Sequence, residues 1–379
     1  MQLNHQNPAH QNPALRAVGG DSSGSGATGP GPLGVAVIGA GYWGPNLARN
    51  AAAHPATRLA YVCDVDVDRA HRVASTYAGA AATADFRRVL DDPLVEAVAI
   101  ATPPSTHARL AIAALRAGKH VLVEKPLADS IADAEAMIAT AELHDRVLMC
   151  DHTYCYTPAV QYLRSIVHAG DLGDLQFIDS VRINLGLVQR DVDVVWDLAP
   201  HDLSILDAVL PPGTGIRSLS ATGADPVGAG QSCVAYLSME LDGGAIAHVH
   251  VNWLSPTKVR RMTIGGSRRT VVWDDLDPVQ RVSVFDRGVD ITQDDGPDAV
   301  TNRKIAYRVG DMVAPALRER EGLAGVFDEL VASIREHRQP LTDGRSGLRV
   351  LRMLQAARTS INTGGRAQPI EDTVMLVSA

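Results

Sequence analysis

Val35-Ala36-Val37-Ile38-Gly39-Ala40-Gly41-Tyr42-Trp43-Gly44 is the stretch of sequence that decides the fold. Its first four residues are apolar and mostly β-branched, which predicts a short buried strand. The glycines that follow have the spacing G-x-G-x-x-G, and Pro45 suits the first turn of a helix, where no N–H donor is needed. The stretch therefore predicts a strand, a tight turn and a helix in immediate succession.

The residues that follow complete the pattern of a dinucleotide-binding unit. A second strand is predicted over residues 59–63, and Asp64 comes directly after it, twenty residues beyond Gly44. Glycines in this turn let a pyrophosphate approach a helix N-terminus, and an acid at this distance can accept hydrogen bonds from both hydroxyls of a ribose. Asp64 would repel a 2′-phosphate, so the sequence favours NAD over NADP as the cofactor. Residues 24–29 repeat the glycine spacing without a preceding strand, and we predict that residues 1–32 form a disordered tail.

Strands and helices continue to alternate as far as residue 150. Apolar runs over residues 97–101 and 121–123 predict strands, and residues 107–117 predict a helix between them. Repeated βα units indicate a parallel, doubly wound sheet, in which ligands bind beyond the carboxyl ends of the strands. Four segments should therefore meet at one crevice, at Gly39, Asp64, Thr102 and Lys125.

The composition excludes several other classes of protein. The chain has 379 residues, of which 46% are hydrophobic, and a net charge of −8 with no long basic block, which disfavours binding to nucleic acid or an anionic membrane. Four cysteines cannot form a disulfide framework in so long a chain, and no apolar stretch is long enough for a membrane span. His248 and His250 share a predicted strand face without a third ligand, so we expect no metal site. These features predict a cytoplasmic protein of two domains that acts on a small molecule.

The later sequence has a different period. Residues 177–187 alternate between polar and apolar, which places Arg182 and Asn184 together on the polar face of a strand. Two hairpins are predicted next, with strands at residues 234–240 and 245–253 around the turn 242–244, and at residues 259–264 and 270–273 around Gly265-Gly266. Successive hairpins predict an antiparallel sheet, and residues 326–336 and 348–361 are expected to be closing helices.

Four motifs in this order resemble the Gfo/Idh/MocA oxidoreductase family, which includes glucose-fructose oxidoreductase and inositol dehydrogenase. The motifs are the glycine stretch 39–44, Thr102-Pro103-x-x-x-His107, Glu124-Lys125-Pro126 and Asp197-Leu198-Ala199-Pro200-His201. The resemblance implies an α/β protein in which a Rossmann domain, here residues 33–150, precedes an α+β domain with a large, mostly antiparallel open sheet, here residues 151–379. It also implies a homodimer or homotetramer that pairs through the outer face of the open sheet.

The same resemblance indicates which residues carry the chemistry. Moving a hydride between nicotinamide and a carbinol carbon requires a group that moves the hydroxyl proton. Lys125 and His201 are both candidates, and the sequence leaves the choice between them open. Asp197 lies one helical turn before His201 and could orient its ring and stabilise its charged form, in a helix that either starts near Trp196 or is kinked at Pro200.

The remaining candidates are assigned to the cofactor or the substrate. The expected cofactor residues are Gly39, Gly41, Tyr42, Trp43, Gly44, Asp64, Thr102, Pro103, His107, Glu124 and Lys125. The expected substrate residues are His152, Arg182 and Asn184. Arg260 and Arg261 are expected to be charged hairpin ends.

A looser resemblance of residues 181–197 to the sugar-biosynthesis branch of the family narrows the function. It favours hydride transfer at a ring carbon of a sugar or nucleotide sugar, with C3 preferred. Asp151-His152-Thr153-Tyr154 departs from the Asn-Arg element of many relatives, which counts against an inositol-like substrate. Two alternatives stay open, namely a lyase or epimerase that uses NAD transiently and a non-catalytic NAD-binding regulator.

Overall fold

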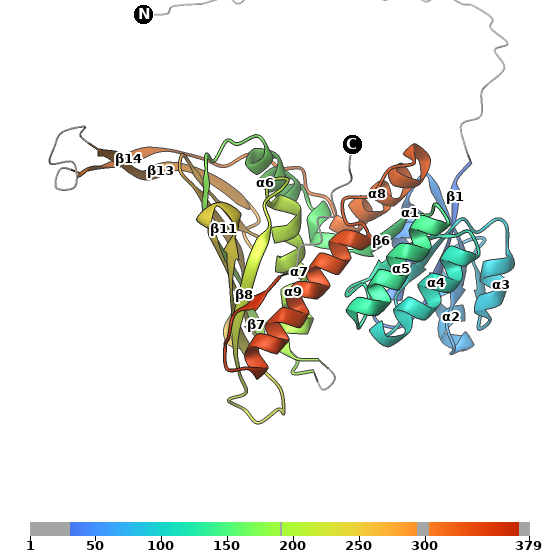
Figure 1. Cartoon of the computed structure of the whole chain (residues 1–379). Helices are drawn as coiled ribbons and strands as arrows, with labels where there is room; N and C mark the ends of the chain where they lie inside the picture. Colours follow the sequence, from blue (N-terminus) through green and yellow to red (C-terminus); the bar gives the residue numbers. More distant parts are fainter. Residues whose placement is uncertain (1–30, 190–191, 294–302, 371–379) are drawn as a thin grey trace, which may run out of the picture. The chain divides into compact units, whose positions relative to one another are not determined.

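The computed structural model describes residues 31–189, 192–293 and 303–370. All of the expected tail except residues 31 and 32 therefore lies outside the described residues. The described chain forms one parallel and one mostly antiparallel sheet (Figure 1). Within these ranges, the helices are too short or too polar to cross a lipid bilayer.

The first sheet has the strand order β3-β2-β1-β4-β5-β6, and all of its strands are parallel. Its elements are β1 (Leu33–Ile38), α1 (Gly44–Ala53), β2 (Thr57–Cys63), α2 (Val67–Ala74), β3 (Ala81–Thr83), α3 (Phe86–Asp91), β4 (Ala97–Ile100), α4 (His107–Arg116), β5 (His120–Glu124), α5 (Ile131–Leu143) and β6 (Leu148–Asp151). The chain order reverses between β1 and β4, so the predicted crevice lies at the switch point of a doubly wound sheet. The predicted parallel sheet is confirmed.

Both faces of this sheet are covered by helices. Val35 and Val37 of β1 face a core that includes residues of α1, whereas Ala36 and Ile38 face a second core with residues of α4 and α5. Burial on both faces explains why β1 and β4 are continuous apolar runs rather than alternating ones.

The second sheet has the order β14-β13-β12-β11-β7-β10-β9-β8-β15, and only the β7–β10 pair is parallel. The elements of this part are α6 (Pro158–His168), β7 (Leu175–Leu185), α7 (Val194–Val209), β8 (Ile216–Ala224), β9 (Val234–Leu241), β10 (Ile246–Asn252), β11 (Leu254–Gly266), β12 (Thr270–Asp274), β13 (Val282–Gln293), β14 (Arg303–Val313), α8 (Gly322–Glu336), α9 (Gly344–Asn362) and β15 (Gln368–Pro369). The predicted open, mostly antiparallel sheet is confirmed.

Helices cover only one face of this second sheet in the described chain. α6, α7 and α9 pack against it, and their apolar side chains join those of β8 to β12 in one core (Figure 1). The strands alternate accordingly, as in β9, where Ala235 and Leu237 are buried and Tyr236 is exposed. β13 and β14 continue beyond the covered part as a two-stranded ribbon (Figure 1).

The last two helices connect the two sheets. Phe327 and Leu330 of α8 complete the core beside α1, and Leu351 of α9 joins the core beside α5. α9 also packs on β8 and α7 of the second sheet. The carboxyl end of the chain thus packs back onto the first sheet and brings the two sets of site residues together.

Candidate active site

The glycine turn is built for close backbone approach. Gly39 has φ +94°, and a Cβ on it would lie 2.6 Å from the carbonyl oxygen of Ala101. A Cβ on Gly44 would lie 1.9 Å from the carbonyl oxygen of Gly39, so both positions exclude larger residues. A Cβ on Gly41, in contrast, would meet no atom within 4 Å. Packing therefore requires the outer glycines, whereas the middle one leaves the backbone open to a ligand.

Asp64 is bound to this turn. Its side chain is buried and accepts hydrogen bonds from the backbone N–H of Ala40 at 2.7 Å and of Asp66 at 2.9 Å. The guanidinium of Arg69 lies 3.7 Å from the same carboxylate. A carboxylate has about four acceptor positions, so these contacts leave capacity for a ribose hydroxyl.

Trp43 joins the glycine turn to the far strand of the sheet. Its Nε1 donates to Asp151 at 3.2 Å, and the Thr153 hydroxyl donates to the same carboxyl at 2.6 Å.

Asp151 lies opposite Glu124 in the β5–β6 register, and the two carboxyls hydrogen-bond each other. Burial, reinforced by Asp151, raises the pKa of Glu124 well above its usual value, and burial also raises the pKa of Asp151. Both shifts favour retention of a proton by the pair. The sequence offered no sign of Asp151 beyond its position at a strand end. Tyr42, next to Trp43, is almost fully exposed.

The ring of His107 lies between two loops of the first sheet. The ring is completely buried, with Nε2 2.8 Å from the carbonyl oxygen of Thr102 and Nδ1 3.0 Å from that of Pro126. Burial lowers its pKa despite these carbonyl partners. Both nitrogens contact the protein in the described structure, so direct binding of His107 to the cofactor stays a prediction. The ring joins the loops that follow β4 and β5, and so positions Thr102 and Pro103.

Lys125 and Asp197 meet across the two parts of the chain. Nζ of Lys125 donates to the Asp197 backbone carbonyl at 3.1 Å and lies 4.0 Å from its carboxylate. The other carboxylate oxygen accepts a hydrogen bond of 3.0 Å from Nε1 of Trp253, which is buried in the core of the second sheet. Both side chains remain partly accessible, at 19% for Lys125 and 28% for Asp197.

α7 carries both Asp197 and His201. The helix runs from Val194 to Val209 with Pro200 inside it, and Asp193 caps its first turn. The helix thus begins before Trp196 and places Asp197 and His201 one turn apart, as expected. No hydrogen bond links the two side chains in the described structure, so the orienting role of Asp197 toward His201 stays a prediction. Burial lowers the pKa of His201 well below its usual value, and Lys125 and Arg182 lower it further. His201 is therefore neutral at neutral pH.

His152 lies at the end of β6, close enough to His201 to influence its charge. The ring is 1% exposed, and neither nitrogen has a hydrogen-bond partner in the described structure. Burial lowers the pKa of His152 to about 4. A buried ring with two unsatisfied nitrogens is uncommon, which makes His152 a candidate for contact with a ligand.

Arg182 was expected to contact substrate, and the structure shows otherwise. Its Nε lies 2.6 Å from the Asp202 carboxylate, and both side chains are only 3% exposed. The polar face of β7 turns toward α7, and the apolar face with Val181 and Ile183 turns outward. Arg182 is thus a buried structural residue, because α7 supplies an acid that the sequence of β7 could not reveal. Asn184 lies beside Trp253, near Asp197.

Two side chains of the site were missed by sequence reasoning. Arg260, expected at a hairpin end, lies within β11, and its Nη1 donates to the Tyr154 hydroxyl at 2.8 Å. The Tyr154 ring packs edge-on against the His201 ring, with 5.1 Å between their centroids. Arg261, the next residue of the strand, lies on the exposed face of the sheet. The sequence could not show which of the two arginines faces the site, because that depends on the strand register.

A cavity of about 320 Å³ lies at the loops that follow β4 and β5. Its lining includes Pro104 and Pro126, which follow the expected cofactor and catalytic positions, together with Trp196 and Arg358. The guanidinium of Arg358 stacks on the Trp196 ring at 4.7 Å. Lys125 and Asp197 do not line this cavity, although their chain neighbours Pro126 and Trp196 do.

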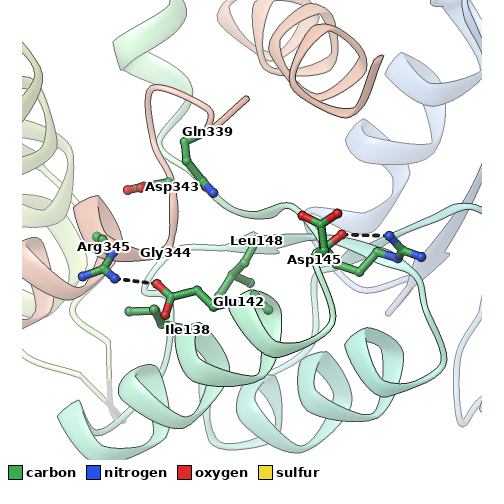
Figure 2. Close-up of a pocket in the computed structure, with 10 residues that line it drawn as sticks. Ile138, Glu142, Asp145, Leu148, Gln339, Asp343, Gly344 and Arg345 are labelled. Carbon is green, nitrogen blue, oxygen red and sulfur yellow. Dashed lines mark hydrogen bonds and ion pairs between the residues drawn. The ribbon is translucent and has the colours of Figure 1, made fainter. Parts of the chain in front are cut away.

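A larger cavity of about 400 Å³ lies elsewhere. It is lined by α5, the start of β6 and the N-terminal turn of α9, where Glu142 and Arg345 form an ion pair of 2.5 Å (Figure 2). Leu148 in its wall is the first residue of β6, so the cavity lies at the opposite end of that strand from Asp151. None of the expected site residues lines it.

Comparisons with known proteins agree with this geometry. Residues 33–152 match the family model described as oxidoreductase family, NAD-binding Rossmann fold, and residues 160–272 match the GFO/IDH/MocA C-terminal domain. UDP-N-acetylglucosamine 3-dehydrogenase from Acidithiobacillus ferrooxidans is 29% identical over 335 residues, which cover 86% of this chain and 96% of the relative. Inositol 2-dehydrogenase 2 from Saccharopolyspora erythraea is 28% identical over 227 residues, covering 57% of this chain and 65% of the relative.

Solved structures show the same architecture. The Acidithiobacillus ferrooxidans enzyme superposes with a TM-score of 0.74 at 28% identity, covering 88% of this chain and 98% of that one. GenD2 from gentamicin A biosynthesis, crystallised with NAD, has a TM-score of 0.74 at 23% identity, covering 93% of this chain and 100% of that one, and shows a shared fold. With both family models matched in order on the fold and motifs described above, the chain belongs to the Gfo/Idh/MocA oxidoreductase family.

Proposed function

We propose that the protein is an NAD-dependent dehydrogenase that transfers a hydride between nicotinamide and a ring carbon, preferably C3, of a sugar or nucleotide sugar. In this proposal residues 33–150 bind the cofactor, and residues 151–379 bind the substrate and form the subunit interface. The observation that carries the proposal is the meeting of Lys125 with Asp197. It brings a residue at the end of a Rossmann strand together with a helix of the substrate domain.

The glycine turn fits a dinucleotide. The open backbone at Gly41 and the N-terminus of α1, which has no side-chain cap, offer N–H donors to a pyrophosphate. Bound NAD supplies the hydride acceptor at its nicotinamide ring. Asp64 at the end of β2 would accept hydrogen bonds from the adenosine ribose, and its buried carboxylate would repel a 2′-phosphate, which favours NAD over NADP. Fluorescence titration with NADH and NADPH measures this preference directly.

Lys125 and His201 divide the proton chemistry. The hydroxyl proton must leave as the hydride departs, and a neutral imidazole can accept it. The lowered pKa of His201 keeps its ring neutral and able to accept a proton, and prevents it from being the general acid at neutral pH. Lys125, held by the Asp197 carbonyl, can bind the same oxygen and stabilise the alkoxide that develops on it.

The substrate assignment is supported by the relatives and by the pocket. The Acidithiobacillus ferrooxidans relative is named for a nucleotide sugar and for position 3. The cavity beside Trp196 and Arg358 is lined by Pro126, the chain neighbour of Lys125, and is proposed to hold the part of the substrate beyond the sugar ring. His152 and Asn184 would bind the sugar, since the unsatisfied nitrogens of His152 require a polar partner.

We further propose a cytoplasmic homodimer or homotetramer that pairs through the outer face of the second sheet. Large apolar side chains on this face and its ribbon are exposed, namely Leu185, Tyr236, Ile246, Val289, Ile291, Ile305, Tyr307 and Val309. A surface of this kind is uncommon on a monomer and indicates a protein interface.

The proposal is tested with a panel of free sugars, cyclitols and nucleotide sugars, monitored by NADH absorbance. We expect NADH to accumulate when a nucleotide sugar or a free sugar is the substrate. Analysis of the product then identifies the carbon of the sugar that was oxidised. Product formation without net NADH would indicate a lyase or epimerase instead. NADH binding without any product from the panel would contradict the dehydrogenase assignment.

A further inference from the structure

Two arginines lie opposite each other on the covered face of the second sheet. Arg182 of β7 and Arg260 of β11 are register partners, and the Tyr154 ring lies next to both guanidinium groups, at 4.5 Å and 6.0 Å. Like charges in directly opposed positions destabilise a sheet unless anions compensate them. Each arginine therefore requires a negatively charged partner.

The two arginines are compensated unequally. Arg182 has Asp202 at 2.6 Å and is almost completely buried with it. Among the described residues, Arg260 pairs with Asp275 alone, at 3.5 Å, and its side chain is still 32% exposed. The contacts of its guanidinium in the described chain engage Nη1 alone. Since a guanidinium carries five N–H donors, Arg260 has donors left for a ligand.

Arg260 is also close to the reacting groups. Its hydrogen-bond partner Tyr154 packs against the ring of His201, and Arg260 is one of the charges that lower the pKa of His201. The Tyr154 hydroxyl accepts from Arg260 and retains its own proton for donation to a ligand. Donors from both side chains therefore lie beside the position expected for the sugar ring.

We propose that Arg260 and Tyr154 form a subsite for an anionic oxygen group of the substrate, either a carboxylate or a phosphate, close to the carbon that exchanges the hydride. The proposal rests on the proposed dehydrogenase function and narrows its substrate class. A guanidinium fork binds carboxylate and phosphate through two parallel hydrogen bonds, a geometry that a neutral hydroxyl cannot match.

The test compares matched substrates and matched variants. Glucose, glucuronate, glucose 1-phosphate, UDP-glucose and UDP-glucuronate are assayed with NAD, using the wild type, Arg260→Met and Arg261→Met. Arg261 is the control because it is the next residue of the same strand and lies on the exposed face. We expect the wild-type ratio of kcat/KM between the preferred anionic sugar and its neutral counterpart to be about 100 or more, the effect of one or two charged hydrogen bonds.

Arg260→Met should reduce the ratio of kcat/KM between the anionic and the neutral sugar to near 1. Arg261→Met should leave this ratio as in the wild type. Preference for glucuronate over glucose identifies a carboxylate, and preference for glucose 1-phosphate identifies a phosphate. Equal kcat/KM for neutral and anionic sugars, or a ratio that survives Arg260→Met, would overturn the subsite while leaving the dehydrogenase proposal intact.

A binding measurement separates the two proposals if turnover is absent. Calorimetric titration of the protein–NADH complex with glucuronate and with glucose 1-phosphate does not depend on catalysis. Binding that is lost in Arg260→Met but kept in Arg261→Met would support the subsite even if the dehydrogenase proposal failed. Absence of binding by both anions would overturn the subsite.

Discussion

The two sheets of this protein contribute to the site in opposite ways. The parallel sheet is covered on both faces, so its only accessible functional positions are the ends of its strands, where Asp64 and Lys125 lie. The second sheet is covered on one face, and it contributes side chains from within its strands, such as Arg260 of β11. Residues at strand ends can be located from the sequence, whereas residues on a strand face depend on which layer covers that face.

The largest effect on activity is expected at Lys125, the strand-end residue of the parallel sheet that is proposed to act on the substrate. We expect Lys125→Ala to lower kcat by about 10²–10³-fold, the range for loss of one donor to a developing oxyanion, because Lys125 is the residue proposed to stabilise the alkoxide. NADH affinity should change far less, since the glycine turn and Asp64 bind most of the cofactor. Steady-state kinetics and fluorescence titration measure the two quantities.

The control for Lys125 is Lys258→Ala, which removes an exposed lysine of β11. It should leave both quantities near the wild-type values. Near-normal turnover in Lys125→Ala would contradict the catalytic assignment.

The next largest effect is expected on the covered face of the second sheet, at the pair of Arg182 and Asp202. Asp202→Asn leaves a buried guanidinium without its counter-ion, so the free energy of unfolding should fall by about 3–5 kcal/mol. Urea denaturation measures this loss. Asp242→Asn breaks the exposed pair with Arg217 and serves as the control, for which we expect little change. Equal losses of unfolding free energy from both substitutions would show that burial does not determine how strongly an ion pair stabilises this fold.

A smaller effect concerns pH and the buried ring of His152. The folded protein binds a proton there only near pH 4, whereas the unfolded chain binds it near pH 6.5. Between these values the unfolded state holds the extra proton, so stability falls as the pH is lowered, by about 1.4 kcal/mol per pH unit for this histidine.

His152→Gln should reduce the pH dependence of the unfolding free energy by that slope, measured by denaturation at pH 4.5, 5.5 and 6.5. His71→Gln, in an exposed position on α2, should leave the slope unchanged. A slope that His152→Gln does not alter would contradict a buried neutral ring.

The smallest effect on folding is expected on the uncovered face. Tyr307→Lys adds a charge to the apolar side of the β13–β14 ribbon, and surface changes of this kind alter stability by only about 0.5 kcal/mol or less. If that face pairs subunits, the mass measured by analytical ultracentrifugation should nevertheless fall. Ala306→Lys, on the opposite side of the ribbon, should keep the wild-type mass. An unchanged mass in Tyr307→Lys would exclude the ribbon from the interface.

Much of the fold could be predicted because its local signals are strong. The strand before Gly39 and the helix after it appear where the apolar run and Pro45 indicated. The alternation in β7 also appeared as expected, but the polar face turned inward because Asp202 of α7 neutralises Arg182 there. The contacts of His107 could not be predicted for a similar reason, since its two carbonyl partners come from separate loops.

The sequence by itself determined the parallel sheet, the glycine turn and the strand-end positions of the site, because these follow from short-range periodicity and backbone sterics. The tertiary structure decided which polar residues are satisfied within the protein and which remain available to a ligand. Asp151, Tyr154 and Arg260 entered the site only through contacts with residues distant in sequence. Burial and charge compensation are properties of the packed layers, so the chemistry of a side chain on a sheet face is set by what packs against it.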